Sequence, residues 1–417
     1  MHAIRRSSAI LLLSFVFRSA LYAQVGTVGV PFLMISPSAE ANGMGGIMAS
    51  VMPAGSSSML FNPAHAGLLA RSTALSTDIY TSRTGWLPVF HIPDLWINHF
   101  SLFAGTASGA AGGNGLAFGI GYSRVYFNLG EFIISSENSP EEVSRFRGYE
   151  TSDNITLGAS IDFGALLAFG TTMKLVTSQL TPFGLIQDPA THPAEILAVD
   201  LGMTAVVPFV SLAFPDAYAA GFRPHGNVML AAVLQNFGGD VAYADASQKD
   251  PLPRLFRAGW SIDAGATIDL FQSTLPFLSI SIAREAEDIL VDRYRDGSWT
   301  YSTFPDDLKP ADNLFSGRRT HNVTVRRGSA VTFLGTVTLR SGSYEGDGAV
   351  TYATEGYTIS TAGLTALIHA AMKDDARESV IGNLLRHVEL RIHHSEYSGH
   401  DIVRGTTFNS MTLSFRR

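Results

Sequence analysis

The chain alternates apolar residues with small or polar ones over segments of about ten positions. The first clear segment is 115–125, where alternate positions carry Leu116, Phe118, Ile120 and Tyr122. Similar alternation recurs in 155–163, 197–207 and 256–268. Because side chains of a β-strand point alternately to opposite faces, each segment predicts a strand with one apolar face.

The length of these segments favours strands that cross a membrane. A tilted strand needs about ten residues to span a bilayer, whereas strands of soluble proteins usually have about five or six. After residue 24, no stretch is apolar over the ~20 residues that a spanning helix requires. The most apolar window, 201–214, is shorter and contains Pro208. A closed barrel satisfies every backbone group by pairing its strands, so it can cross without such a helix.

The pattern predicts an all-β fold: a transmembrane antiparallel β-barrel of about fourteen strands over residues 72–417, placed in lipid in the bacterial outer membrane. The predicted strands are 72–80, 96–106, 115–125, 155–163, 166–178, 197–207, 227–236, 256–268, 276–284, 321–330, 336–342, 357–369, 388–397 and 406–415. Long polar connections, including 126–149 and 285–320, are expected outside the cell. Short turns such as Gly164-Ala165 alternate with them, and 370–387 is predicted to contain a short periplasmic helix.

Residues 1–23 have the features of a signal peptide. Arg5 and Arg6 give a positive start, 10–17 form a short apolar stretch, and small residues permit cleavage after Ala23. We therefore expect export from the cytoplasm.

Residues 24–71 are rich in glycine and small residues and show no strand pattern. Their apolar content and turn residues favour packing inside a large barrel as a hatch. The candidate hatch or ligand-gating residues are Gly43, Gly45, Gly46, Phe61, Asn62, Pro63 and Ala64. The Phe-Asn-Pro-Ala element could gate a hydrophobic ligand or form a rigid turn that ends the hatch, and both interpretations stay open.

Composition excludes several other classes of protein. Hydrophobic residues make up 46% of the chain, which argues against disorder although only 16% of residues are charged. The net charge of −7 gives no basic surface for nucleic acid. With no cysteine, the chain has no disulfide, thiolate metal site or cysteine nucleophile.

No catalytic motif is present, so we expect a non-enzymatic protein without cofactor or metal. His393, His394 and His400 form a cluster near Glu396 and Asp401. His393 and His394 should face opposite sides of a strand, so we interpret the cluster as exposed at a loop edge, with a metal or catalytic site as the alternative. Five charged residues fall on the inferred inner face of the barrel: Lys174, Asp162, Asp200, Arg257 and Asp263. They could fill the lumen as paired charges, or they could form a network that fixes the hatch or guides a ligand.

Two blocks carry a resemblance to a known family. The order "G..G..FL.I...A.A.GMGG" followed by "FNPA..GL" resembles the N-terminus of the PorV/PorQ family of outer-membrane proteins. That family is related to FadL-type long-chain fatty-acid transporters, which share the Asn-Pro-Ala element. Here His65-Ala66 separates that element from Gly67-Leu68, a departure that affects local hatch geometry.

The resemblance implies a fourteen-stranded barrel with an N-terminal plug. It also implies a role as a binding or shuttle component of type IX-like protein secretion and surface attachment. The partners would then be secreted cargo proteins, bound through their C-terminal domains, and secretion-system subunits. The alternative is a FadL-like transporter of hydrophobic small molecules across the outer membrane.

Overall fold

The computed structural model describes residues 28–108, 115–136, 139–180, 193–218, 221–243, 249–270, 273–294, 296–303, 307–316, 322–346, 351–399 and 402–417. The predicted signal peptide, residues 1–23, lies outside the described residues, as does His400.

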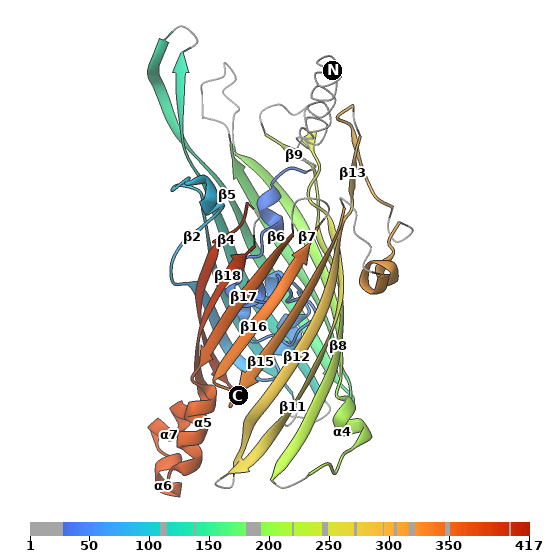
Figure 1. Ribbon diagram of the computed structural model, residues 1–417, viewed down its shortest axis with the longest axis vertical. Coiled ribbons are helices and arrows are strands. Elements are labelled where there is room, and N and C mark those ends of the chain that lie inside the picture. Colours follow the sequence, from blue (N-terminus) through green and yellow to red (C-terminus); the bar gives the residue numbers. More distant parts are fainter. Residues whose placement is uncertain are drawn as a thin grey trace, which may run out of the picture.

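Fourteen strands of the described chain form one closed antiparallel barrel (Figure 1). They are β1 (Thr73–Tyr80), β3 (Trp96–Ala107), β4 (Gly115–Ser136), β5 (Ser139–Asp162), β6 (Leu166–Gln179), β7 (Ala194–Val207), β8 (Phe222–Gly238), β11 (Leu255–Leu270), β12 (Ser273–Ile289), β15 (Val323–Phe333), β16 (Val337–Glu345), β17 (Thr351–Ser360), β18 (Val388–Ser398) and β19 (Thr407–Arg416). Each pairs with its neighbour in chain order, and β1 also pairs with β19, which closes the wall. The predicted fold class is confirmed.

The outer face of the wall is apolar. Along β7 every second side chain is buried from Ala194 to Thr204, while Leu197, Leu201 and Met203 are exposed. Neighbouring strands carry the same kind of exposed side chain: Phe118, Ile120, Leu157, Phe169, Leu230, Ile280, Ile282, Leu339, Ile359 and Ile392. Only lipid solvates a continuous apolar surface of this size well. The wall is that of an outer-membrane protein.

The two ends of the barrel differ. At one end, called here the short-turn end, Gly164 and the tight turn 334–336 join neighbouring strands. At the opposite, long-loop end, short elements fill the connections: β2 (Thr84–Gly85), η3 (Pro88–Phe90), β9 (Val241–Ala242), β10 (Lys249–Asp250), β13 (Val291–Arg293) and β14 (Trp299–Tyr301). Long loops outside and short turns inside are the usual arrangement in outer-membrane barrels.

Three predictions about the connections are wrong. Residues 126–149 are not a loop, because β4 and β5 continue as a paired hairpin that rises above the wall in Figure 1. The strand predicted over 357–369 ends at Ser360, and a helix follows.

The third correction concerns the loop predicted over 285–320. There β12 extends to Ile289, and the π-helix η4 (Asp312–Ser316) places Leu314 against the outer-wall residues Ala258 and Ala286. The helix η4 therefore folds onto the outside of the wall.

Helices project at the short-turn end. They are α4 (Phe209–Ala213), α5 (Ala362–Ala371), α6 (Asp374–Arg377) and α7 (Val380–His387). The start of α7 is capped by Ser379, whose hydroxyl accepts from the Gly382 amide at 3.2 Å. The helix predicted within 370–387 is confirmed. No helix of the described residues is long and apolar enough to span a membrane.

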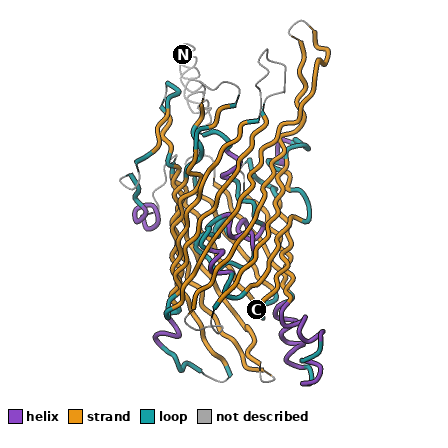
Figure 2. Tube along the Cα trace, turned by 180° about the vertical axis from the view of Figure 1, so that it is seen from behind, coloured by secondary structure: helices purple, strands orange, loops and turns teal. Residues whose placement is uncertain are grey.

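Residues 28–72 occupy the interior of the barrel and are called here the N-terminal segment (Figures 1 and 2). The segment contains η1 (Pro31–Met34), α2 (Ala39–Asn42), η2 (Ser56–Leu60) and α3 (His65–Leu69). At the long-loop end, the Gly29 amide donates to Pro251 O at 2.9 Å. At the short-turn end, Arg71 Nη2 donates to Gly115 O at 2.8 Å. The segment thus runs the length of the lumen before β1 begins.

Candidate functional site: the filled lumen

Five inward-facing glycines form a row across five adjacent strands, called here the glycine ladder. Its members pair in direct register: Gly105, Gly119, Gly158, Gly170 and Gly202. A Cβ atom on Gly158 would lie 2.7 Å from the Gly67 amide nitrogen and 2.9 Å from Pro63 O. Because the wall carries no side chains here, the backbone of the N-terminal segment packs directly against it.

The Phe-Asn-Pro-Ala element lies on the glycine ladder. Asn62 Nδ2 donates to Thr204 Oγ1 at 2.8 Å and to Ala49 O at 3.1 Å, so it ties the wall to a second turn of the segment. Asn62 Oδ1 also accepts from the Ala64 amide at 3.0 Å, as in an Asx turn. Phe61 is buried beside the guanidinium of Arg257, 5.8 Å from its ring centre. These contacts hold residues 61–64 as a turn against the wall, and the choice between a gate and a rigid end of the hatch stays open.

The Gly-Met-Gly-Gly element contacts the opposite side of the wall. Gly43 lies against Gly356 of β17. The Gly45 amide donates to Thr354 Oγ1 at 2.8 Å. Gly45 and Gly46 have φ values of +74° and +80°, which residues with a side chain rarely adopt. The segment is therefore held between two glycine-lined areas of the wall.

A buried charge cluster fixes the middle of the segment. The amide and hydroxyl of Ser50 donate to Glu285 Oε1 at 2.8 and 2.9 Å. Arg257 pairs with Glu287 and lies 3.8 Å from Glu285. Arg326 Nη2 lies 3.1 Å from Glu287 and its Nη1 donates to Gly45 O at 3.4 Å. Charged side chains of the wall therefore form hydrogen bonds directly to the N-terminal segment.

Lys174 and Asp200 form a second buried ion pair, 2.7 Å apart, with side chains 7% and 1% exposed. Lys174 also donates to Asn236 Oδ1 at 2.8 Å, and the Asn236 amide donates to Asp200 at 2.8 Å. Two charges that are buried to this extent are stable only when hydrogen bonds and ion pairs compensate both of them. The pair stabilises a β-bulge where β8 meets β7.

The other two predicted charges lie elsewhere. Asp162 is at the short-turn rim, 3.8 Å from Arg71. Asp263 accepts from Ser279 at 2.7 Å and lies 3.7 Å from His225. The five predicted charges are thus divided among separate contacts and do not form one network.

A chain of hydrogen bonds crosses five strands and reaches the segment. Arg340 Nη2 donates to Glu40 at 2.7 Å, and its Nη1 donates to Thr358. His393 connects Thr358 at 2.8 Å to Thr412 at 3.0 Å, and Thr412 donates to Asp78 at 2.8 Å. The full chain is Glu40, Arg340, Thr358, His393, Thr412 and Asp78.

The prediction of an exposed histidine cluster was wrong for His393, which is 1% exposed and lies inside the lumen. His394 does face the other side of the wall, where it bonds Asn409 at 2.8 Å. The inward position of His393 follows from the alternation along β18. The same inner-face rule could have identified four further charges that the sequence analysis missed: Glu285, Glu287, Arg326 and Arg340.

A row of inward rings, called here the aromatic belt, lines the lumen nearer the long-loop end. Its members are Tyr344, Tyr352, Tyr397, Phe408, Tyr80 and His99, contributed by six adjacent strands. Tyr344 and Tyr352 stack in parallel with ring centres 4.8 Å apart, and the Tyr352–Tyr397 distance is 4.6 Å.

The three tyrosines of the belt border a cavity of about 300 Å³. Phe32 and Ile35 of the N-terminal segment form another side, and Trp86 and Val403 of the outer loops form a third. The wall residues Phe127 and Arg326 also line the cavity. Nearby, Val30 donates its amide to the Tyr243 hydroxyl at 2.9 Å, and burial raises the pKa of Tyr243 to about 12. The cavity is therefore shared between the wall, the loops and the segment.

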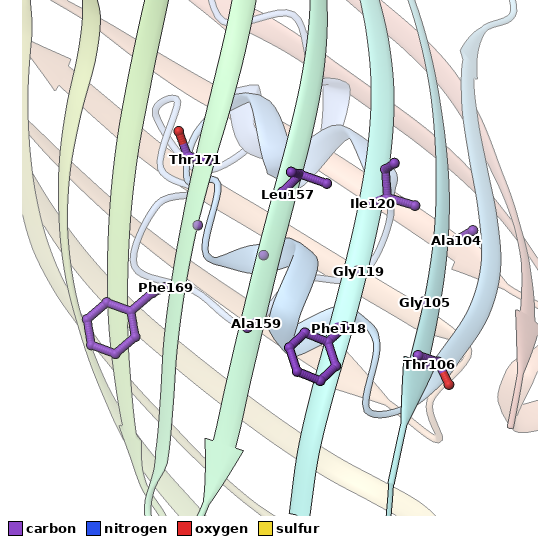
Figure 3. A pocket seen from close by; sticks show the side chains of 12 residues that line it. Ala104, Gly105, Thr106, Phe118, Gly119, Ile120, Leu157, Ala159, Phe169 and Thr171 are labelled. Carbon is purple, nitrogen blue, oxygen red and sulfur yellow. The ribbon is translucent and has the colours of Figure 1, made fainter.

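The outer surface of the glycine ladder has a hollow of about 740 Å³ (Figure 3). The rings of Phe118 and Phe169 stand on either side of Ala159, and helical turns of the N-terminal segment lie behind the strands. Pairing from β3 to β6 is unbroken here. The hollow is thus a dent in the lipid-facing surface and not an opening between strands.

Comparisons with known proteins find similarity in structure alone. No protein-family model matches the chain. No curated protein matches it. The toluene transporter TodX of Pseudomonas putida is 10% identical over 90% of this chain and 95% of its own, with a TM-score of 0.37. A FadL homologue of Pseudomonas aeruginosa is 9% identical over 91% and 98%, with a TM-score of 0.39. OprD of the same organism is 8% identical over 85% and 96%, with a TM-score of 0.29. Such weak similarity carries no argument about function, and the fold rests on the strand pairing described above.

Proposed function

We propose that the protein is a non-enzymatic outer-membrane conduit for hydrophobic small molecules. The observation that carries this proposal is the cavity bordered by Tyr344, Tyr352 and Tyr397. A concave site with apolar walls and a few polar groups is the usual form of a small-molecule site. Its position below the outer loops suits capture from outside the cell.

Passage beyond this cavity requires movement of the N-terminal segment, since the segment fills the lumen beneath it. A lateral route would have to separate strands whose pairing is continuous. Displacing the segment instead breaks its hydrogen bonds to the wall, among them those of Ser50, Glu40 and Asn62, and leaves the strand pairing intact. We therefore assign the gating role to the segment, including Gly43, Gly45, Gly46 and residues 61–64.

The secretion-shuttle function remains a prediction from the family resemblance. Its test is a pull-down from solubilised membranes, in which secreted proteins or secretion subunits would have to accompany the barrel. Recovery of the barrel with bound apolar molecules and without these proteins would favour the conduit.

Binding of N-phenyl-1-naphthylamine, an apolar dye that fluoresces when shielded from water, tests the cavity directly. Tyr352→Ala removes one wall and should weaken binding about 3- to 10-fold, because an aromatic contact contributes ~0.5–1.5 kcal/mol. Tyr357→Ala is the matched control, since Tyr357 lies on the same strand but faces outward. Equal binding by both variants and the unmodified protein would contradict the proposal.

A further inference from the structure

The helices α5 and α7 expose an unusual amount of apolar surface. Val380 is 86% exposed, and five further large apolar residues of these helices are also exposed: Leu364, Leu367, Ile368, Ile381 and Leu384. The two helices contact each other and the ends of β12, β18 and β19. They form a small helical unit at the short-turn end, and its outward residues need an apolar environment.

This helical unit continues the lipid-facing wall. It connects β17 to β18, whose outward residues Ile359 and Ile392 are 49% and 48% exposed and belong to the apolar outer face. Figures 1 and 2 show the helices at the edge of the barrel at its short-turn end. The apolar surface of the unit therefore begins where the membrane core ends, at the level of the phospholipid headgroups.

A cavity of about 370 Å³ separates the unit from the barrel rim. Arg386 and Arg416 are among its lining residues, and Glu389 is the one carboxylate among them. Glu389 already accepts from Arg391 at 2.8 Å and pairs with Arg416. Positive charge is thus in excess among the lining residues. Guanidinium groups bind phosphate well because their planar donors match two of its oxygens.

We propose that this rim cavity binds a phospholipid of the periplasmic leaflet. The phosphate lies between Arg386 and Arg416, with hydroxyl donors available from Thr274 and Thr365. The acyl chains extend into the membrane core along the outward residues Ile359 and Ile392, and the exposed apolar residues of α5 and α7 lie in the interface beside the headgroup. A cationic pocket beside an apolar helix face, at the edge of a membrane-spanning wall, fits a lipid better than a free anion, which would leave that face in water.

Lipid retention tests the headgroup site. The barrel is purified in mild detergent, incubated with phosphatidylglycerol and examined by native mass spectrometry. Arg386→Gln should reduce retained lipid several-fold, and Arg386→Glu should reduce it further. Arg404→Gln at the long-loop end is the matched control. Retention by both Arg386 variants equal to that of the control would overturn the proposal, as would a loss confined to binding of inorganic phosphate.

Labelling tests the apolar face independently. Because the chain has no cysteine, a single introduced cysteine can carry a spin label. Ile381→Cys and Asn383→Cys place the label on nearly opposite sides of α7, at two exposed positions. In phospholipid nanodiscs, the label at 381 should be accessible to oxygen and protected from a water-soluble nickel reagent, and the label at 383 should show the reverse. Full water accessibility at both positions would overturn the proposal and assign this face to another occupant.

Discussion

The backbone amide and the hydroxyl of Ser50 both donate to one oxygen of Glu285, at 2.8 and 2.9 Å, across 235 positions of sequence. The other oxygen of that carboxylate lies 3.8 Å from Arg257. One buried anion of the wall therefore holds the N-terminal segment and balances a buried cation.

Glu285→Gln should loosen the segment. Bonds to a charged acceptor contribute about 1.5–3 kcal/mol, so losing the charge should speed amide hydrogen exchange around Ser50 about tenfold or more. Glu355→Gln, on the exposed face of β17, is the control and should leave exchange unchanged. Unchanged exchange in the Glu285 variant would show that the segment is held by other contacts.

Removing one partner of the Lys174–Asp200 pair should be costly. Lys174→Met or Asp200→Leu alone leaves a buried charge without its partner and should lower the free energy of unfolding by about 3–5 kcal/mol. The double variant should recover part of this loss. Urea unfolding in lipid vesicles measures all three, and losses that simply add would contradict the pairing.

Gly158→Ala should disturb the contact between the wall and α3. The added methyl group would meet Gly67 and Pro63, and overpacking of this kind costs about 1–3 kcal/mol. Gly239→Ala is the control, since a Cβ there meets nothing within 4 Å. The midpoint of urea unfolding should fall for Gly158→Ala alone, and equal midpoints would contradict close packing on the glycine ladder.

Neighbouring histidines should respond differently to replacement by phenylalanine. His393→Phe removes one hydrogen bond from each of Thr358 and Thr412, which keep their bonds to Arg340 and Asp78, and should cost about 1–3 kcal/mol in total. His394→Phe faces the outside and should cost much less. If both variants unfold at the same urea concentration, His393 does not connect the strands as the structure indicates.

The strands of the wall could be predicted because lipid on one side and a packed lumen on the other require strict alternation. The alternation of apolar and polar residues stops where the chain leaves the wall and no longer lies between lipid and the packed lumen. Above the wall, β4 and β5 continue as a paired hairpin over residues 129–148, and the polar residues of this stretch suggested a loop. Below it, the run of apolar residues in α5 suggested that β17 continued, although Leu364, Leu367 and Ile368 are exposed on a helix.

The candidate site was predictable only in part, because a sequence shows which face a residue occupies but not its partner. Lys174 and Asp200 were both placed inside, yet their pairing depends on the register of β6 and β7. Glu285 and Glu287 were missed because their stretch of β12 was assigned to a loop. The glycine ladder also depends on register, since its members come from five separate strands.

The N-terminal segment lies ahead of the whole wall in sequence, but it bonds to strands from both ends of the chain. Arg391 of β18 donates to Ala54 O, for example, while Asn62 bonds to β7. The wall is completed only when β19, the last strand, pairs with β1. The contacts of the segment are therefore complete only when the first and the last strands of the wall are both in place, so the fit of the segment depends on the closure of the barrel.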